Sequence, residues 1–491
     1  MEPTALDKII SYLSPQRGAE RMRWRMISGA MAGYEGASRS KRTSNWKAGG
    51  GSANSETRSA LTTLRHRHRD LVRNNAYAAA AVREIPAHMV GTGIIPQVRA
   101  RSSGDQQRYE ELVHEWFETT ACDAEGVHNF YGLQNLAART IVEAGEVMVR
   151  QVINRDPSLP LPLQLHVIEP DHLDHTKDGH LLENGNKVIQ GVEVTPRNER
   201  VAYWIFPEHP GDHYMRSLVS ERVPAEQMIH AFRVDRPGQV RGVPWGAPVL
   251  MRLRDFDEYE DAQLVRQKIA ACFAAFMYNP DPMSSGDASA ELPDKLEPGM
   301  LEELPGGRDI RFADPPSVEG YGEYSRVTLH EIATGYGIPY PVLTGDQSQA
   351  NFSSARMGWL SFSRSIQQWT HNMLVPQMCM PVWRWFNRFA AIEHNLGRAD
   401  VKWSAPRRPM VDPAREVPAL RDAVRSGQIT QMEAIRQQGY DPTEFLEEVR
   451  QGNEVMDQHG IVFDSDPRKT SGAGLTQARP EDSELPPTSG D

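Results

Sequence analysis

Residues 248–278 read PVLMRLRDFDEYEDAQLVRQKIAACFAAFMY, and the fold predicted for the whole chain is built around this stretch. Its pattern predicts one helix of about 30 residues, which would be roughly 45 Å long at 1.5 Å per residue. Arg266 and Lys268 follow the acidic first half, an order that suits the helix dipole. The first half carries five carboxylates: Asp255, Asp257, Glu258, Glu260 and Asp261.

Beyond this helix, the chain is predicted to form a loop, two short strands and then a second helix that runs back alongside the first. Residues 279–298 are rich in Pro, Gly, Ser and Asp, which is typical of an exposed loop. Residues 299–312 predict two short strands joined at Pro305–Gly307. A return helix is predicted at 321–336, because Val327, Leu329, Ile332 and Ala333 recur at helical spacing.

A polar loop at 344–351 separates the return helix from the longest helical pattern, at 353–391. Phe362, Ile366, Trp369 and Met373 form its apolar seam. Pro376 and Pro381 predict bends in that helix. Short helices are predicted at 417–425, 430–438 and 442–451, with Thr430 and Glu433 at capping-box spacing. The composition after Phe463 favours disorder.

The N-terminal half predicts an α+β domain that ends near residue 245. A basic helix is expected over 54–89, and its His66 and His68 are expected on a solvated face. Glu143 and Glu146 flank Gly145 at a helix-to-strand turn, where exposed acids are favoured over an acid/base pair. Other elements are predicted as helices at 105–119 and 131–143 and strands at 145–152, 163–168, 201–206 and 228–232.

Charge is unevenly distributed along the 491 residues, whose formal net charge is −11. Residues 1–73 hold 14 Lys and Arg against 6 Asp and Glu, so the rest of the chain is strongly acidic. The basic segment either meets an acidic surface or nucleic acid, or serves only solubility. Three widely spaced cysteines exclude a disulfide framework, and no apolar run is long enough for a transmembrane helix.

Motifs for common catalytic sites are absent from the sequence. It contains no GxxxxGK[ST] phosphate loop, no HExxH metal motif and no GxSxG nucleophile turn. The loop containing His172, Asp174, His175, Asp178 and His180 matches no structural metal motif and is expected to be a polar hairpin. No catalytic residue, metal site or cofactor is therefore predicted.

Several short motifs, in their order over roughly residues 55–450, resemble the lambda-like family of tailed-bacteriophage portal proteins. The resemblance rests on the following stretches: Arg69–Asn75 with the alanines after it, Ile168–Asp171, Gly242–Gly246, Gly337–Leu343 and Asn351–Arg356. It implies an α+β portal fold that forms a ring, typically of twelve subunits, around a channel for double-stranded DNA. No enzymatic activity is implied.

The resemblance also implies a division of the chain into regions. The expected regions are a flexible basic arm (1–54), a wing (55–247), a stem helix (248–278), a clip (279–320), a return stem helix (321–343), a tunnel loop (344–352), a wing or spine helix (353–405), a helical crown (406–463) and a disordered tail (464–491).

Three sets of residues are candidates for function under this resemblance. The acids at 255–261 are candidates for lining the channel, where they would repel phosphate, although they could instead pair with arginines nearby or on a neighbouring subunit. The DNA-facing loop candidates are Asp346, Gln347, Ser348, Gln349 and Asn351. The clip candidates, expected to dock terminase, are Glu302, Glu303, Arg308, Asp309 and Arg311.

The expected partners are other copies of the chain, double-stranded DNA, the terminase large subunit, the major capsid protein or scaffold, and head–tail connector proteins, with no membrane. The expected location is the portal vertex of the virion, after assembly in the host cytoplasm. Two alternatives remain: a capsid-shell or scaffold-type protein, and a nucleic-acid-processing enzyme. The enzyme would need a phosphate loop or a converging carboxylate cluster.

Overall fold

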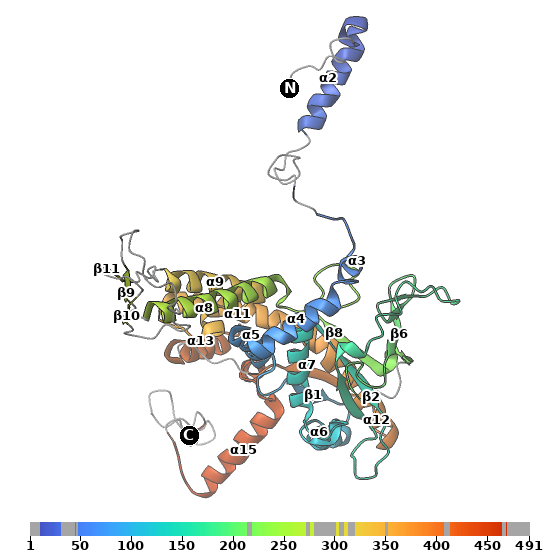
Figure 1. The fold of residues 1–491 in the computed structure, drawn as a ribbon. Coiled ribbons are helices and arrows are strands. Elements are labelled where there is room, and N and C mark those ends of the chain that lie inside the picture. Colours follow the sequence, from blue (N-terminus) through green and yellow to red (C-terminus); the bar gives the residue numbers. More distant parts are fainter. Residues whose placement is uncertain are drawn as a thin grey trace, which may run out of the picture. The chain divides into compact units, whose positions relative to one another are not determined.

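The computed structural model describes residues 10–30, 45, 48–213, 219–271, 275–278, 301–303, 309–312, 320–348, 352–406, 413–463 and 468. The chain divides into two compact units, Met1–Ser52 and Ala53–Asp491, because most contacts lie within each unit. The first contains helix α2 (Pro15–Ala30), which was not predicted. The second contains all the other elements (Figure 1).

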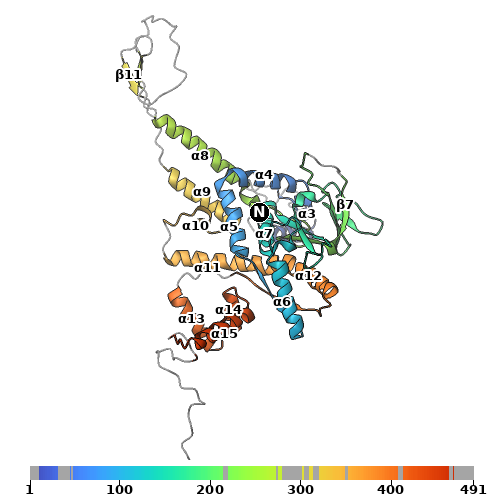
Figure 2. The same ribbon diagram turned by 90° about the horizontal axis from the view of Figure 1, so that it is seen from below.

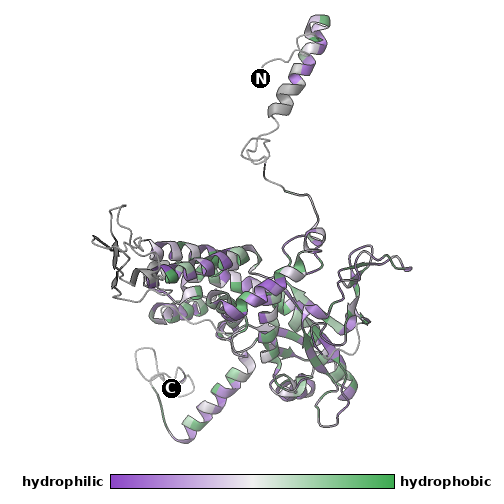
Figure 3. Cartoon of the chain, viewed as in Figure 1, coloured by the Kyte–Doolittle hydropathy of each residue, from purple (hydrophilic) through white to green (hydrophobic). Residues whose placement is uncertain are grey.

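The predicted basic helix at 54–89 is three helices: α3 (Ala53–Thr57), α4 (Leu61–Asn74) and α5 (Ala76–Val90). Asn75 causes the break between α4 and α5. Its backbone is extended, and its side-chain oxygen accepts hydrogen bonds from the backbone N–H groups of Tyr77 and Ala78, which makes it the N-cap of α5. Helix α5 continues through Pro86. Helix α4 is hydrophilic along most of its length (Figure 3).

Helices α6 (Ser103–Phe117) and α7 (Phe130–Ala144) confirm the two helices predicted next. They pack beside an antiparallel sheet with strand order β3-β2-β8, made of β2 (Glu146–Val152), β3 (Gln164–Ile168) and β8 (Met228–Phe232). A second antiparallel sheet has the order β4-β5-β6-β7, and its strands are β4 (Lys187–Ile189), β5 (Val192–Val194), β6 (Arg200–Ile205) and β7 (Glu221–Pro224).

Two antiparallel helices extend from this body, α8 (Leu250–Ala271) and α9 (Tyr321–Tyr336), and they lie side by side in both views (Figures 1 and 2). The helix predicted to reach residue 278 is shorter, because Ala275–Tyr278 is strand β9. Aromatic residues at 276 and 278 favour a strand there. Strand β9 pairs in parallel with β10 (Leu301–Glu303) and antiparallel with β11 (Asp309–Phe312).

After the short helix α10 (Tyr340–Thr344), a helical path runs through α11 (Phe352–Trp369), η6 (Thr370–Cys379) and α12 (Met380–Glu393). Segment η6 is a π-helix that contains Pro376. Proline lacks the N–H that an α-helical turn requires, so a change of hydrogen-bond register accommodates it. Strand β12 (Asp400–Ser404), which was not predicted, then pairs antiparallel with β1 (Ile95–Arg99).

Three helices end the described chain: α13 (Pro413–Arg425), α14 (Gln431–Gln437) and α15 (Pro442–Gln458). Thr430 caps α14 as its spacing predicted, since its hydroxyl accepts a hydrogen bond from the N–H of Glu433 at 3.1 Å. One large core joins α4–α9, α11, α12 and the β3-β2-β8 sheet, and a smaller core lies between that sheet and the second sheet. No helix in the described part combines the length and apolar character needed to cross a bilayer.

Candidate functional site at the junction of sheet and stem

Helix α4 joins the sheet to the α8–α9 pair through side chains on one of its faces. Arg65 and His68 are three residues apart, so they lie on the same side of the helix, and both are buried. Arg65 contacts Glu146 of the β3-β2-β8 sheet, while His68 contacts Tyr336 of α9. The prediction that His68 belongs to a solvated face is therefore wrong.

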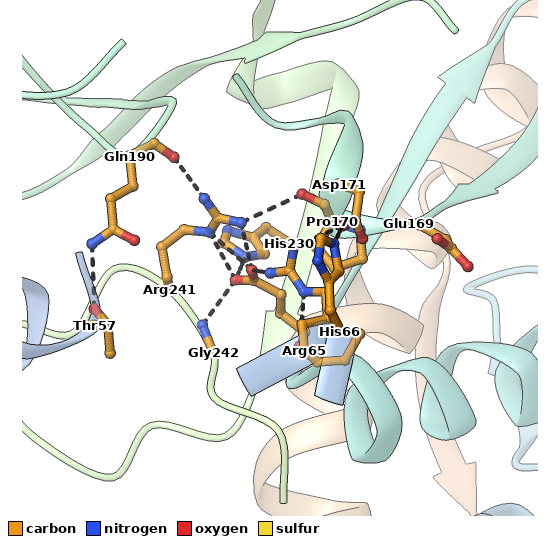
Figure 4. A network of polar contacts seen from close by, with 12 residues as sticks. Thr57, Arg65, His66, Glu169, Pro170, Asp171, Gln190, His230, Arg241 and Gly242 are labelled. Carbon is orange, nitrogen blue, oxygen red and sulfur yellow. Dashed lines mark hydrogen bonds and ion pairs between the residues drawn. The ribbon is translucent and has the colours of Figure 1, made fainter. Parts of the chain in front are cut away.

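Glu146, the first residue of β2, is the centre of a buried polar network. Figure 4 shows four of its partners, Arg65, His230, Arg241 and Gly242, close together. Its carboxylate accepts hydrogen bonds from Arg65 Nη2 at 2.9 Å and from Arg241 Nη2 at 2.6 Å. His230 Nε2 donates to it at 2.8 Å, and so does the backbone N–H of Gly242, also at 2.8 Å. The expectation of an exposed acid at this turn is therefore wrong, because the Glu146 side chain has no solvent exposure.

Charges in this network balance. Burial opposes ionisation of Glu146, but Arg241, His230 and Arg65 outweigh that effect and hold its pKa well below the ordinary value. Asp171, 3.4 Å from Arg65, supplies the second carboxylate, and its pKa is also lowered because Arg65 and Arg69 outweigh its burial. Two arginines facing two carboxylates satisfy the requirement that buried charges be paired.

His230 makes the stability of this network depend on pH. Burial lowers its pKa to about 4, from 6.5 in the unfolded chain. The unfolded chain therefore binds more protons between these values, and the free energy of unfolding should fall by about 3 kcal/mol as pH drops through that interval. Chemical denaturation at several pH values measures this slope. His230→Gln keeps an N–H donor but cannot titrate, so its curve should be flatter; an equal slope would contradict the assignment.

His68 links α4 to α9. Its Nδ1 lies 2.6 Å from the carbonyl oxygen of Glu143, and its Nε2 lies 2.7 Å from the Tyr336 hydroxyl. A carbonyl can only accept, so Nδ1 carries the proton and Nε2 accepts from the tyrosine. Burial keeps the pKa of His68 below its ordinary value. Gly246 leaves the room for this contact, since a Cβ there would lie 2.4 Å from Nε2.

Glu169, Asp171 and His209 bring ligand-type atoms within 4.8 Å of one another at the edge of this network. Arg69 Nη2 already lies 2.8 Å from both carboxylates. His209 Nδ1 accepts a hydrogen bond from the Gly211 N–H at 3.1 Å, so in the neutral ring the proton stays on the Nε2 that faces Glu169. These contacts identify an ion-pair cluster that extends the Glu146 network.

The five predicted acids of α8 do not share one face. Asp255, Glu258 and Asp261 are exposed, and Glu258 pairs with Arg254 at 3.1 Å. Asp257 and Glu260 turn toward the chain itself. Asn75 Nδ2 donates to Asp257 at 2.6 Å, and the Tyr321 hydroxyl donates to Glu260 at 3.1 Å. Burial raises the pKa of Asp257. Of these five acids, the three exposed ones are therefore available to an outside molecule.

The predicted polar loop begins with a fixed turn at Asp346. Its carboxylate accepts hydrogen bonds from the Ser348 N–H at 2.9 Å and from the Tyr340 hydroxyl at 3.1 Å. The Ser348 bonds and the Tyr340 bond lower the pKa of Asp346, so it is anionic at neutral pH. Gln347 and Ser348 are exposed. Gln349 and Asn351 lie outside the described residues.

The predicted clip residues fall on the small sheet beside α8 and α9. Glu302 and Glu303 are in β10, and Asp309 and Arg311 are in β11. Arg311 is opposite Phe276 in the antiparallel register, and Glu302 is opposite the same residue in the parallel register. Arg308 lies outside the described residues. The Glu146 network contains no described member of the three predicted sets, although Asp171 and Gly242 belong to two of the stretches that carry the family resemblance.

A protein-family model described as "Phage portal protein, lambda family" matches residues 39–370. A probable portal protein of Halomonas phage phiHAP-1 is 27% identical over 426 residues, covering 81% of each chain. The portal protein B of Escherichia phage lambda is 22% identical over 441 residues, covering 78% of this chain and 82% of the relative.

One similar solved structure is the neck of a native gene transfer agent particle computed with C12 symmetry. Its chain is 14% identical, with a TM-score of 0.44, and the alignment covers 76% of this chain and 93% of that one.

Proposed function

Because the chain belongs to the lambda family of phage portal proteins, we propose that copies of it form a dodecameric ring at one capsid vertex, through which double-stranded DNA passes during packaging and ejection. The observation that carries this proposal is the family match, which extends over residues 39–370 and so includes the whole α8–sheet–α9 excursion. The proposed role is structural and needs no catalytic group.

Each region then takes a part in the ring. The sheets with α4–α7 serve as the wing, α8 and α9 as the stem, and the β9–β11 sheet as the clip that docks the terminase large subunit. The loop at 344–352 faces DNA, and α13–α15 form the crown. Capsid or scaffold protein and head–tail connector proteins are the remaining partners. The ring is assembled in the host cytoplasm and remains in the virion.

Native mass spectrometry and negative-stain class averages of the purified chain test the ring directly. We expect about twelve copies around a central hole. A chain that remains monomeric or dimeric at high concentration and with scaffold protein would refute the proposal.

The exposed acids of α8 support a channel wall that does not hold DNA. Replacing Asp255, Glu258 and Asp261 together with alanine should raise the affinity of the isolated ring for duplex DNA by about tenfold at low salt, because removing anions weakens repulsion of phosphate. Filter binding across a salt series measures this effect. The matched control is Asp257→Ala with Glu260→Ala, whose carboxylates face the chain. Equal affinity of the triple variant and the parent would oppose channel lining.

The loop prediction is tested by replacing residues 346–351 with Gly and Ser. Rings should assemble as in the parent, because the hydrogen bonds of Asp346 to described residues stay within its own turn and Tyr340. DNA packaging or retention should fall several-fold, and nuclease-protected DNA per particle measures it. A similar replacement of the exposed turn at 426–428 is the control. Packaging equal to that of the control would refute the loop assignment.

A further inference from the structure

The three C-terminal helices leave an open apolar groove of about 630 Å³ between them. Its apolar wall includes Val417, Leu420 and Val424 of α13, Ile435 of α14 and Phe445 of α15. Helix α13 has no fully buried residue, and Val417 is 51% exposed. An apolar groove between helices is the kind of surface into which the apolar face of a partner helix packs.

Helix α15 carries an apolar stripe that continues past this groove. Phe445, Val449, Gly452 and Met456 recur at steps of four, three and four residues, so they lie on one side of the helix. Phe445 is at the groove, next to Tyr440 with ring centroids 5.5 Å apart. Val449 is 43% exposed, and Phe463, beyond the helix, is 53% exposed. Met456 is half-buried, so beyond the groove the described residues cover the stripe only in part.

Helix α15 cannot cover the rest of its own stripe by folding back into the groove. It is continuous over 17 residues, which is about 25 Å, and its first turn forms part of the groove wall. Figure 1 shows α15 leading away from the neighbouring helices toward its C-terminal end. Its last turns therefore point out of their own groove.

The groove and helix α15 also carry opposite charges. Two arginines line the groove, Arg421 and Arg425, and within the described residues Arg425 makes no ion pair. Helix α15 is acidic, and Arg450 already pairs with Glu447 and Glu454. Glu448, on the flank of the apolar stripe, makes no ion pair to any described residue. A basic groove and an acidic helix with an apolar stripe are complementary surfaces.

We propose that the part of α15 beyond its first turn, residues 446–458, packs from one copy into the α13–α14–α15 groove of the next copy. The helix stripe and the groove are different surfaces, so the contact is heterologous and repeats from copy to copy until a ring closes. This inference rests on the proposed ring and names one of the contacts that would hold it together.

Cross-linking between two variants that each carry one introduced cysteine tests the contact. Cys122 and Cys379 are buried, and Cys272 is replaced by Ser in every variant. One variant carries Ala434→Cys in the groove, and the other carries Met456→Cys on the stripe. After mixed assembly and mild oxidation, non-reducing gels should show at least tenfold more disulfide-linked dimer than either variant gives alone. Val449→Cys is the second stripe position if Met456→Cys does not assemble.

Glu454→Cys is the matched control, because residue 454 lies on the opposite side of α15 from the stripe. Native mass spectrometry of each mixture shows whether rings form, which tests the proposed ring separately from the α15 contact. If rings form but the stripe cysteine cross-links no better than Glu454→Cys, the α15 contact is overturned and the proposed ring stands. A groove occupied by residues 464–491 would give that result. Absence of any ring would instead overturn the proposed function.

Discussion

Replacing Glu146 with glutamine should lower the free energy of unfolding by about 3–5 kcal/mol, the usual cost of removing one partner from a buried ion pair. Glutamine has nearly the same volume, so packing is conserved and the loss is electrostatic. Arg65 and Arg241 would remain buried, with Asp171, 3.4 Å from Arg65, as the carboxylate left to them in the network. Urea denaturation at one fixed protein concentration measures the change, because subunit association also contributes to stability.

Glu258→Gln is the control for this prediction. Glu258 also pairs with an arginine, at 3.1 Å, but its side chain is 66% exposed and that of Arg254 is 70% exposed. Exposed pairs contribute about 0–1 kcal/mol. If the two variants lost similar stability, the Glu146 network would not be the strong electrostatic contact described above.

Local patterns in the sequence predicted much of the secondary structure. Helices α6, α7 and α9 and strands β2, β3 and β8 follow from spacing and composition, and Thr430 caps α14 as its spacing indicated. These elements are determined by residues near one another in the chain. The end of α8 was misplaced, because the alanine-rich sequence before β9 favours a helix while the residues at 276–278 favour a strand.

The Glu146 network could not be predicted in this way, because its contacts are far apart in sequence. Arg65 is 81 residues from Glu146, and Arg241 is 95 residues from it. A charged residue beside a glycine at a turn has the local features of an exposed position. Its burial depends on where the loop at 241–242 passes, which is a property of the tertiary fold. The strand β12 was missed for the same reason, since it pairs with β1, whose residues lie far away in the sequence.

Gly145→Ala should be about as damaging as the loss of Glu146. Gly145 has φ +94°, a conformation that strains an L-residue, and an added Cβ would lie 2.4 Å from the carbonyl carbon of Val243 and 2.6 Å from the nitrogen of Pro244. Both atoms belong to the backbone, so neither can rotate away. Strain and overpacking each cost about 1–3 kcal/mol, which gives about 2–6 kcal/mol in total. The midpoint of urea unfolding measures the loss.

Gly427→Ala separates the two contributions. Gly427 has a similar φ of +74°, but nothing lies within 4 Å of the position of its Cβ, so only backbone strain of about 1–2 kcal/mol should remain. The difference between the variants then measures the close approach of two backbone segments at Gly145. Because Glu146 is the next residue, any shift that relieves this contact also disturbs the hydrogen bonds of its carboxylate with Arg65, Arg241 and His230. Burial lowers the pKa of His230 and the contact with Glu146 raises it, so weakening that contact should steepen the pH dependence assigned to His230, whereas Gly427→Ala should leave it unchanged.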